Sequence, residues 1–149
     1  MLVVTNKKTL VFEMCGRKNV AVGFFALGLF MLHGFLLVYF RDFSSMKEAW
    51  EDSYGAGRHL QERMAHVHGG LFALLNIVIG YFLLRLQYQL TNISAISWLA
   101  LVGMCMPLGI LAYLYLGLPP FLVLVGAACM VISVIWLGIS FVRAKSIYL

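Results

Sequence analysis

Four long apolar segments divide the chain, and each is nearly free of charged residues. They cover Asn19–Phe40, Ala65–Leu84, Ser94–Leu116 and Pro120–Val142. Each is close to the roughly 20 residues that an α-helix needs to cross about 30 Å of hydrocarbon. The pattern therefore predicts an all-α fold, an integral membrane four-helix bundle that forms a single membrane domain over residues 1–149.

Composition excludes an ordinary soluble domain. Hydrophobic residues make up 62% of the chain and charged residues only 11%, whereas typical soluble domains are about 25% charged. The net charge of +5 lies mostly near the ends of the apolar segments, which indicates contact with lipid headgroups and not with nucleic acid. We therefore expect the lipid bilayer as a partner, together with other membrane subunits or further copies of this chain.

The basic residues predict the orientation of the bundle. They precede the first apolar segment and follow the last one, whereas the connection over residues 41–64 carries slightly more acidic than basic side chains. The positive-inside rule then places both termini in the cytoplasm and this long connection outside. The two later connections are short, which predicts an up-down-up-down bundle. The first segment is expected to be retained as a signal anchor, because its apolar stretch is too long for a cleavable signal peptide.

All four histidines belong to the outer half of the first two segments. His33 lies within the first segment, His66 and His68 lie at the start of the second, and His59 lies with Glu62 on the expected helical extension that precedes it. At about 100° per residue, His59, Glu62 and His66 share one helix face, and His68 points away from His66 by roughly 160°. An ionisable residue inside a span is costly and usually has a partner or a task, so this cluster is the candidate site.

The face that carries His66 continues as a stripe of mostly small residues, which favours a close contact between helices. The stripe comprises Gly69, Ala73, Ile77 and Gly80. On the first segment, His33 shares a face with Val22 and Ala26, and we expect the two faces to meet. We also expect Asn76 to form an interhelical hydrogen bond and Pro107 to kink the third segment.

A haem is one cofactor that this pattern could hold. Imidazole is a common axial ligand of haem iron, and His33 with His66 or His68 could supply two such ligands. Arg41, Arg58 and Arg63 lie at the level where the haem propionates would emerge. The resulting hypothesis is a small redox or accessory subunit that uses the outer-half histidines.

A single metal ion is the other cofactor hypothesis. His59, Glu62 and His66, together with His33, offer three imidazoles and one carboxylate, which suit copper, iron or zinc. Two hypotheses without a cofactor compete with the haem and metal hypotheses. The cluster could serve a structural subunit of a larger membrane complex, or Glu62 and Arg63 could act in a lipid-modifying enzyme at the membrane edge.

Two resemblances bear on these hypotheses. The run from Arg63 to Leu71, with its Ala-His-x-His-Gly pattern, resembles small uncharacterised four-helix bacterial membrane proteins, and the likeness extends to Met106–Gly109. That resemblance implies a bacterial inner membrane location. The opening Glu62-Arg63 more distantly resembles the membrane-associated eicosanoid and glutathione metabolism family, which implies a glutathione-dependent or lipid-modifying enzyme.

Overall fold

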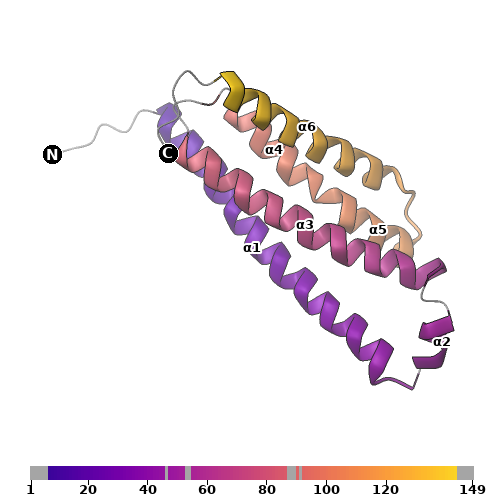
Figure 1. Cartoon of the computed structure of the whole chain (residues 1–149). Coiled ribbons are helices and arrows are strands. Elements are labelled where there is room, and N and C mark those ends of the chain that lie inside the picture. Colours follow the sequence, from indigo (N-terminus) through magenta and orange to yellow (C-terminus); the bar gives the residue numbers. More distant parts are fainter. Residues whose placement is uncertain (1–6, 46, 53–54, 87–89, 91, 144–149) are drawn as a thin grey trace.

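A computed structural model describes residues 7–45, 47–52, 55–86, 90 and 92–143 (Figure 1). These residues are mostly helical, and they contain no strand. The helices are α1 (Lys7–Asp42), α2 (Lys47–Asp52), α3 (Gly57–Arg85), α4 (Ile93–Gly103), α5 (Cys105–Leu116) and α6 (Phe121–Arg143).

Four helical segments are long and apolar enough to cross a membrane, namely α1 from Met14 onward, α3, α4 together with α5, and α6. This confirms the four predicted segments and indicates an integral membrane protein. Because α3 begins at Gly57, His59 and Glu62 lie on its first two turns. Successive spans run in opposite directions, and the start of α1 lies at the same end of the bundle as the end of α6 (Figure 1).

The third span consists of two helices because the helical hydrogen-bond pattern is interrupted at Met104. The Met104 amide donates to Leu101 O at 3.1 Å, and Pro107 has no N–H to donate to the carbonyl four residues earlier. Ala100 O, just before the break, accepts a hydrogen bond from Asn76 Nδ2 of α3 at 3.0 Å. The predicted interruption near Pro107 is confirmed, and a neighbouring helix supplies a donor to the backbone there.

The spans form two pairs. α1 packs along α3, α6 packs against α4 and α5, and α3 joins the pairs through its contacts with α5. α1 lies at the edge of the bundle (Figure 1), where its contacts with α4 are less extensive than those with α3. One long face of α1 is therefore left uncovered beside α5.

Glycines bring the backbones of α1 and α3 close together. A Cβ atom added at Gly23 would lie 2.8 Å from Ala73 O, and one added at Gly80 would lie 2.7 Å from Gly16 O. Larger side chains could not fit at these positions without separating the helices. The predicted stripe of small residues is thereby confirmed as the face of α3 that contacts α1.

The face of α1 that meets α3 differs from the prediction. Gly23 and Phe30 lie against α3, and the Phe30 ring occupies the space above Gly69. Val22 and Ala26 instead line a groove between α1 and the α4–α5 segment. The contact with α3 is therefore centred on the glycine face and not on the predicted stripe, because the closer approach available at glycine sets the rotation of α1.

A polar cluster lies within the apolar core, where α1, α3 and α4 meet. Asn19 and Asn76 are fully buried, and Asn19 Nδ2 donates to Asn76 Oδ1 at 2.9 Å. Asn19 Nδ2 also donates to Ser97 O at 3.2 Å, and the Ser97 hydroxyl donates to Asn19 Oδ1. The interhelical hydrogen bond predicted for Asn76 is confirmed, and these contacts fix three helices against one another.

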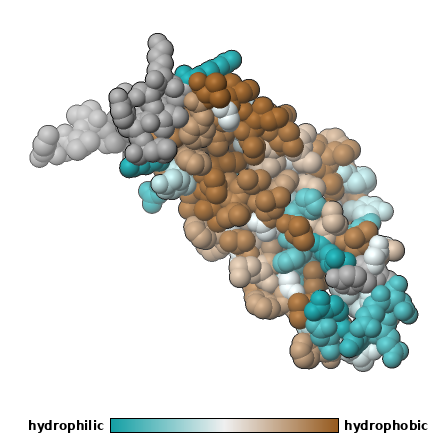
Figure 2. All heavy atoms as spheres, viewed as in Figure 1, coloured by the Kyte–Doolittle hydropathy of each residue, from teal (hydrophilic) through white to brown (hydrophobic). Residues whose placement is uncertain are grey.

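The surface of the bundle is apolar along its middle. Apolar side chains cover the central part of the face in Figure 2, and hydrophilic side chains gather at the end that carries α2. Large side chains such as Phe25, Phe35 and Leu124 are highly exposed, as expected of a surface that contacts lipid or another membrane protein. The end of the bundle that carries α2 is called the α2 end below.

Candidate functional site

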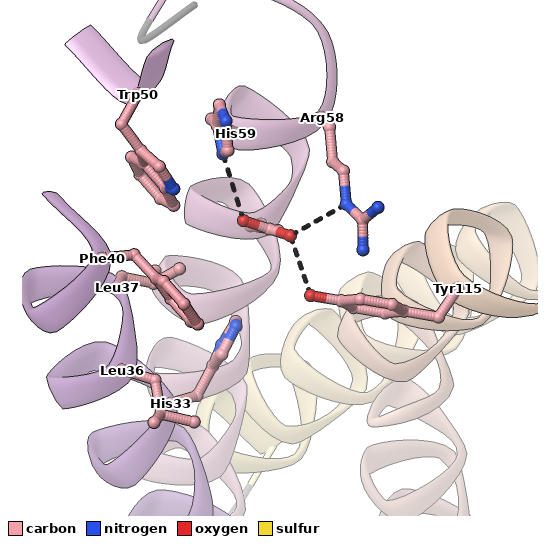
Figure 3. A pocket seen from close by; sticks show the side chains of 9 residues that line it. His33, Leu36, Leu37, Phe40, Trp50, Arg58, His59 and Tyr115 are labelled. Atoms are coloured by element: carbon pink, nitrogen blue, oxygen red, sulfur yellow. Dashed lines mark hydrogen bonds and ion pairs between the residues drawn. The ribbon is translucent and has the colours of Figure 1, made fainter. Parts of the chain in front are cut away.

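A cavity of about 460 Å³ opens at the α2 end, between α1, α2, α3 and α5 (Figure 3). Its walls combine apolar and aromatic side chains with several polar ones, a lining typical of small-molecule sites. The lining residues are His33, Leu36, Leu37, Phe40, Trp50, Arg58, His59, Glu62 and Tyr115. This cavity is called the chamber.

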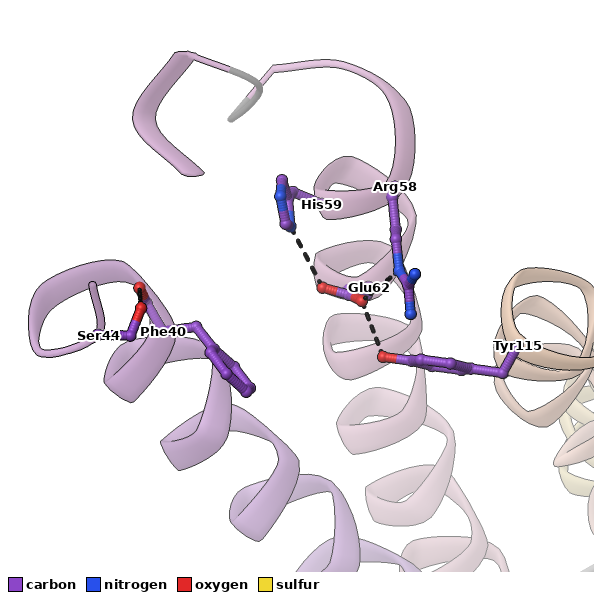
Figure 4. A network of polar contacts seen from close by, with 6 residues as sticks. All are labelled: Phe40, Ser44, Arg58, His59, Glu62 and Tyr115. Carbon is purple, nitrogen blue, oxygen red and sulfur yellow. Dashed lines mark hydrogen bonds and ion pairs between the residues drawn. The ribbon is translucent and has the colours of Figure 1, made fainter. Parts of the chain in front are cut away.

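Glu62 is the central polar group of the chamber. It is only 6% exposed, and a buried carboxylate needs donors around it. Tyr115 Oη donates to Glu62 Oε1 at 2.8 Å, and Arg58 Nε donates to the same oxygen at 3.2 Å (Figure 4). His59 Nδ1 lies 3.4 Å from Oε2. The carboxylate is thus held by both α3 and α5, and Arg58 balances its charge.

Trp50 connects the short helix α2 to this cluster. Its side chain is buried, and its ring lies 3.8 Å from the His59 ring, centroid to centroid, with the planes tilted by 33°. Apolar contact between the two rings holds α2 against the start of α3. The helix α2 thereby forms one wall of the chamber.

His33 reaches the chamber from α1. Its ring points from α1 toward α3 in Figure 3. The Nδ1 atom is buried and has no hydrogen-bond partner among the described residues. Buried polar atoms are rarely left unpaired, because losing water without a replacement costs about 1–3 kcal/mol. His33 therefore carries an unpaired buried nitrogen on a side chain that lines the cavity.

His66 lies beside His33, as the site hypotheses require. The two ring centroids are 6.1 Å apart, with the planes at 70°. His66 Nδ1 lies 2.7 Å from Phe30 O, so this nitrogen carries the proton and donates to the carbonyl. The opposite nitrogen, Nε2, then has a free lone pair, an arrangement common among metal-binding histidines.

The other predicted ligands are distributed elsewhere. His68 Nδ1 donates to Met64 O at 2.8 Å, one turn earlier on α3, and its ring contacts Phe72 edge to face. His68 therefore lies apart from the chamber, in agreement with its predicted direction. Arg41 and Arg63 line a separate cavity of about 140 Å³ together with His66, and Arg41 forms a bidentate ion pair with Asp42.

The candidate ligands are not assembled into one metal centre. Among the described residues, no group of three or more His, Cys, Asp or Glu side chains is placed to hold a metal ion. His33, His59 and Glu62 line the chamber, whereas His66 lines the smaller cavity. A haem would also need a slot between the rings of His33 and His66. Neither the chamber, nor the smaller cavity, nor the cavity between α1 and the α4–α5 segment is lined by both histidines.

A second large cavity lies nearer the middle of the bundle than the chamber. It has a volume of about 410 Å³ and lies between α1 and the α4–α5 segment. His33 is its polar member, and the other lining residues are Val22, Phe25, Ala26, Leu29, Phe30, Met104, Leu108 and Leu111. His33 lines both cavities, so the two cavities border the same side chain. This second cavity is called the groove.

Tyr115 and Trp50 are two site residues that the sequence pattern did not reveal. Both are typical interfacial residues, and their types alone do not distinguish a headgroup contact from a cavity wall. A signal was nevertheless present for Tyr115, because antiparallel packing puts the end of the third span at the level of Glu62.

No protein-family model, curated protein or solved structure matches this chain, so its site is defined by its own geometry.

Proposed function

We propose that this protein is a membrane-embedded binding protein whose chamber holds a small-molecule cofactor. It would serve as a small redox or accessory subunit. The observation that carries the proposal is His33, whose Nδ1 is buried without a described partner and whose side chain lines a 460 Å³ cavity. A rotation of the imidazole ring toward a bound molecule would give this nitrogen the missing hydrogen bond. An exclusively structural cluster would leave that nitrogen unpaired.

The chamber is already organised to receive a ligand. Glu62 is fixed by donors from two helices, and Trp50 is fixed against His59. Side chains that are held in place before binding lose little entropy when a ligand arrives. The polar wall and the aromatic wall are therefore rigid supports for a molecule that carries both polar and apolar groups.

The proposal includes the orientation that the charges predict. Basic residues near the start of α1 and the end of α6 favour a cytoplasmic location for that end, which puts the α2 end and the chamber outside. The bacterial inner membrane is the membrane that the sequence resemblance suggests. The exposed apolar faces of α1 and α6 suit contact with other membrane subunits or with a second copy.

A transition metal bound by His33 and His66 is the second candidate. Two rings 6.1 Å apart, one with Nε2 left free by its bond to Phe30 O, could hold copper, iron or zinc with water or a ligand completing the set. A haem is supported less well. The ring of Phe30 against Gly69 and the ring of His66 against Gly34 would have to part before a porphyrin could enter.

Purification in a mild detergent tests both candidates. We expect native mass spectrometry of the wild type to show a retained small molecule, and His33→Ala to lose it. His68→Ala is the matched control, since His68 is a histidine outside the chamber, and it should retain the molecule. Bound metal lost in both His33→Ala and His66→Ala would favour the second candidate, and a Soret band would identify haem. Wild-type protein with neither a small molecule nor a metal would refute the proposal.

A further inference from the structure

The chamber and the groove differ in chemistry and border one shared side chain. The chamber contains five polar residues among its nine lining residues, whereas the groove is apolar except for His33. A ligand that fills both would need a polar head and an apolar chain joined at the level of His33. This inference rests on the proposed function, since it names the class of molecule that the chamber holds.

The charges around the chamber favour an uncharged head. Arg58 and Glu62 form an ion pair, and the phenol of Tyr115 adds a neutral donor to the same carboxylate. No cation among the chamber residues is left over to balance a phosphate or a carboxylate on the ligand. Burying such an anion without a counter-charge would be costly, which disfavours phospholipids and fatty acids.

The shape and chemistry of the walls favour a flat ring. Phe40, Trp50 and Tyr115 present aromatic surfaces to the chamber, and aromatic groups pack well against planar rings. His33 lines the chamber, and an imidazole N–H can donate a hydrogen bond to an oxygen on such a ring. A planar, uncharged ring with carbonyl or hydroxyl oxygens satisfies both requirements.

The groove provides a place for a hydrocarbon chain. It follows α1 from His33 toward Val22 and is closed on the other side by Met104 and Leu108. Phe25 and Leu29 on its rim are highly exposed, so the groove opens on the surface that would face lipid. A chain attached to a ring in the chamber could therefore enter sideways from the bilayer.

We infer that the chamber and groove together bind a lipid quinone or quinol, with the ring beside His33 and the hydrocarbon chain in the groove. Binding is non-covalent, and it transfers no electrons. His33 contributes a hydrogen bond to a ring oxygen, and the groove contributes dispersion contacts along the chain.

Two probes that share the same ring test the chamber and the groove independently. One is a dimethoxy-methyl-benzoquinone with a ten-carbon saturated chain, and the other is that ring without a chain. Binding of each is measured by equilibrium dialysis of the full-length protein at one fixed detergent concentration. Because partition of the chain into micelles is the same for every variant, ratios between variants report on the protein alone.

Leu108→Trp tests the groove, and Leu32→Trp is the matched control. Leu108 lines the groove and is half exposed, whereas Leu32 is similarly exposed on α1 and lines none of the three cavities. We expect Leu108→Trp to weaken binding of the chain-bearing probe about tenfold, by excluding part of the chain. Binding of the chain-free ring should stay unchanged, and Leu32→Trp should bind both probes like the wild type.

A photoreactive group at the end of the ten-carbon chain gives a second measurement that requires no variant. After irradiation, we expect labelled peptides to contain residues 22–29 of α1, or Met104 together with residues 105–111 of α5. Labelling spread evenly over lipid-facing helix surfaces would contradict the inference, as would equal affinity of Leu108→Trp and the wild type for the chain-bearing probe. If neither quinone binds but another molecule copurifies in a His33-dependent way, the inference fails and the proposed function stands. If nothing binds at all, both fail.

Discussion

Replacing Asn76 by leucine should destabilise the bundle although it makes the core more apolar. Asn76 is fully buried and forms two interhelical hydrogen bonds, one with Asn19 at 2.9 Å and one with Ala100 O at 3.0 Å. Leucine has a similar size and cannot form either bond. The change therefore removes polar contacts and leaves little empty volume.

The magnitude follows from the bonds that are lost. Interhelical hydrogen bonds in membrane proteins contribute about 0.6 kcal/mol on average, so the two together account for roughly 1 kcal/mol. The carbonyl of Ala100 lies beside the break at Met104, where the amide bonds to Leu101 O, and losing the Asn76 donor there adds about 1–2 kcal/mol. We expect the free energy of unfolding to fall by about 2–3 kcal/mol.

Reversible unfolding in mixed micelles, followed by circular dichroism, measures this change. Val78→Leu, at a more exposed position of the same helix, is the control and should unfold like the wild type. A double-mutant cycle with Asn19→Leu should give a coupling energy of about 0.6 kcal/mol, and at most about 1.7 kcal/mol. Wild-type stability of Asn76→Leu, or zero coupling with Asn19→Leu, would refute the role assigned to these bonds.

Other parts of the structure give three further predictions. Gly23→Leu should destabilise the bundle by about 1–3 kcal/mol through overpacking, because a Cβ there meets Ile77 of α3 at 2.6 Å. Gly28 has open space around it, so Gly28→Ala should raise the free energy of unfolding by about 0.5–1 kcal/mol. Equal unfolding curves for the two variants would contradict this packing. Tyr115→Phe should cost roughly 1 kcal/mol in the same assay by removing its bond to Glu62, and no change would mean that the bond is not formed. In a cysteine-free background, Lys47→Cys should react with a membrane-impermeant maleimide added outside the cell and a cysteine at the end of α6 should not; the reverse pattern would invert the proposed topology.

Several site features followed from the sequence because they depend on local helical geometry. Glu62 and His59 lie three residues apart, so a continuous helix puts them on one face, and they are in contact as predicted. His68 points away from His66 for the same reason. The small-residue stripe on α3 was also predictable, since its members recur at helical spacing and close packing requires small side chains.

The rotation of α1 could not be predicted from its own pattern. Its apolar residues surround the helix on all sides, so periodicity does not mark a buried face. Gly16 and Gly23 decide the contact with α3, and their effect depends on the backbone that lies opposite. As a result Val22 and Ala26, expected at the α3 contact, line the groove instead.

The sequence by itself determined the four membrane-spanning helices, their alternating order and the gathering of histidines near one end, because hydrophobic length and helical pitch are properties of contiguous residues. The tertiary structure decided which of those histidines share a cavity. It separated Arg41 and Arg63 from the chamber and placed Tyr115 against Glu62. The physical reason is that contacts between helices depend on their rotation and spacing, which side chains on both partners fix together.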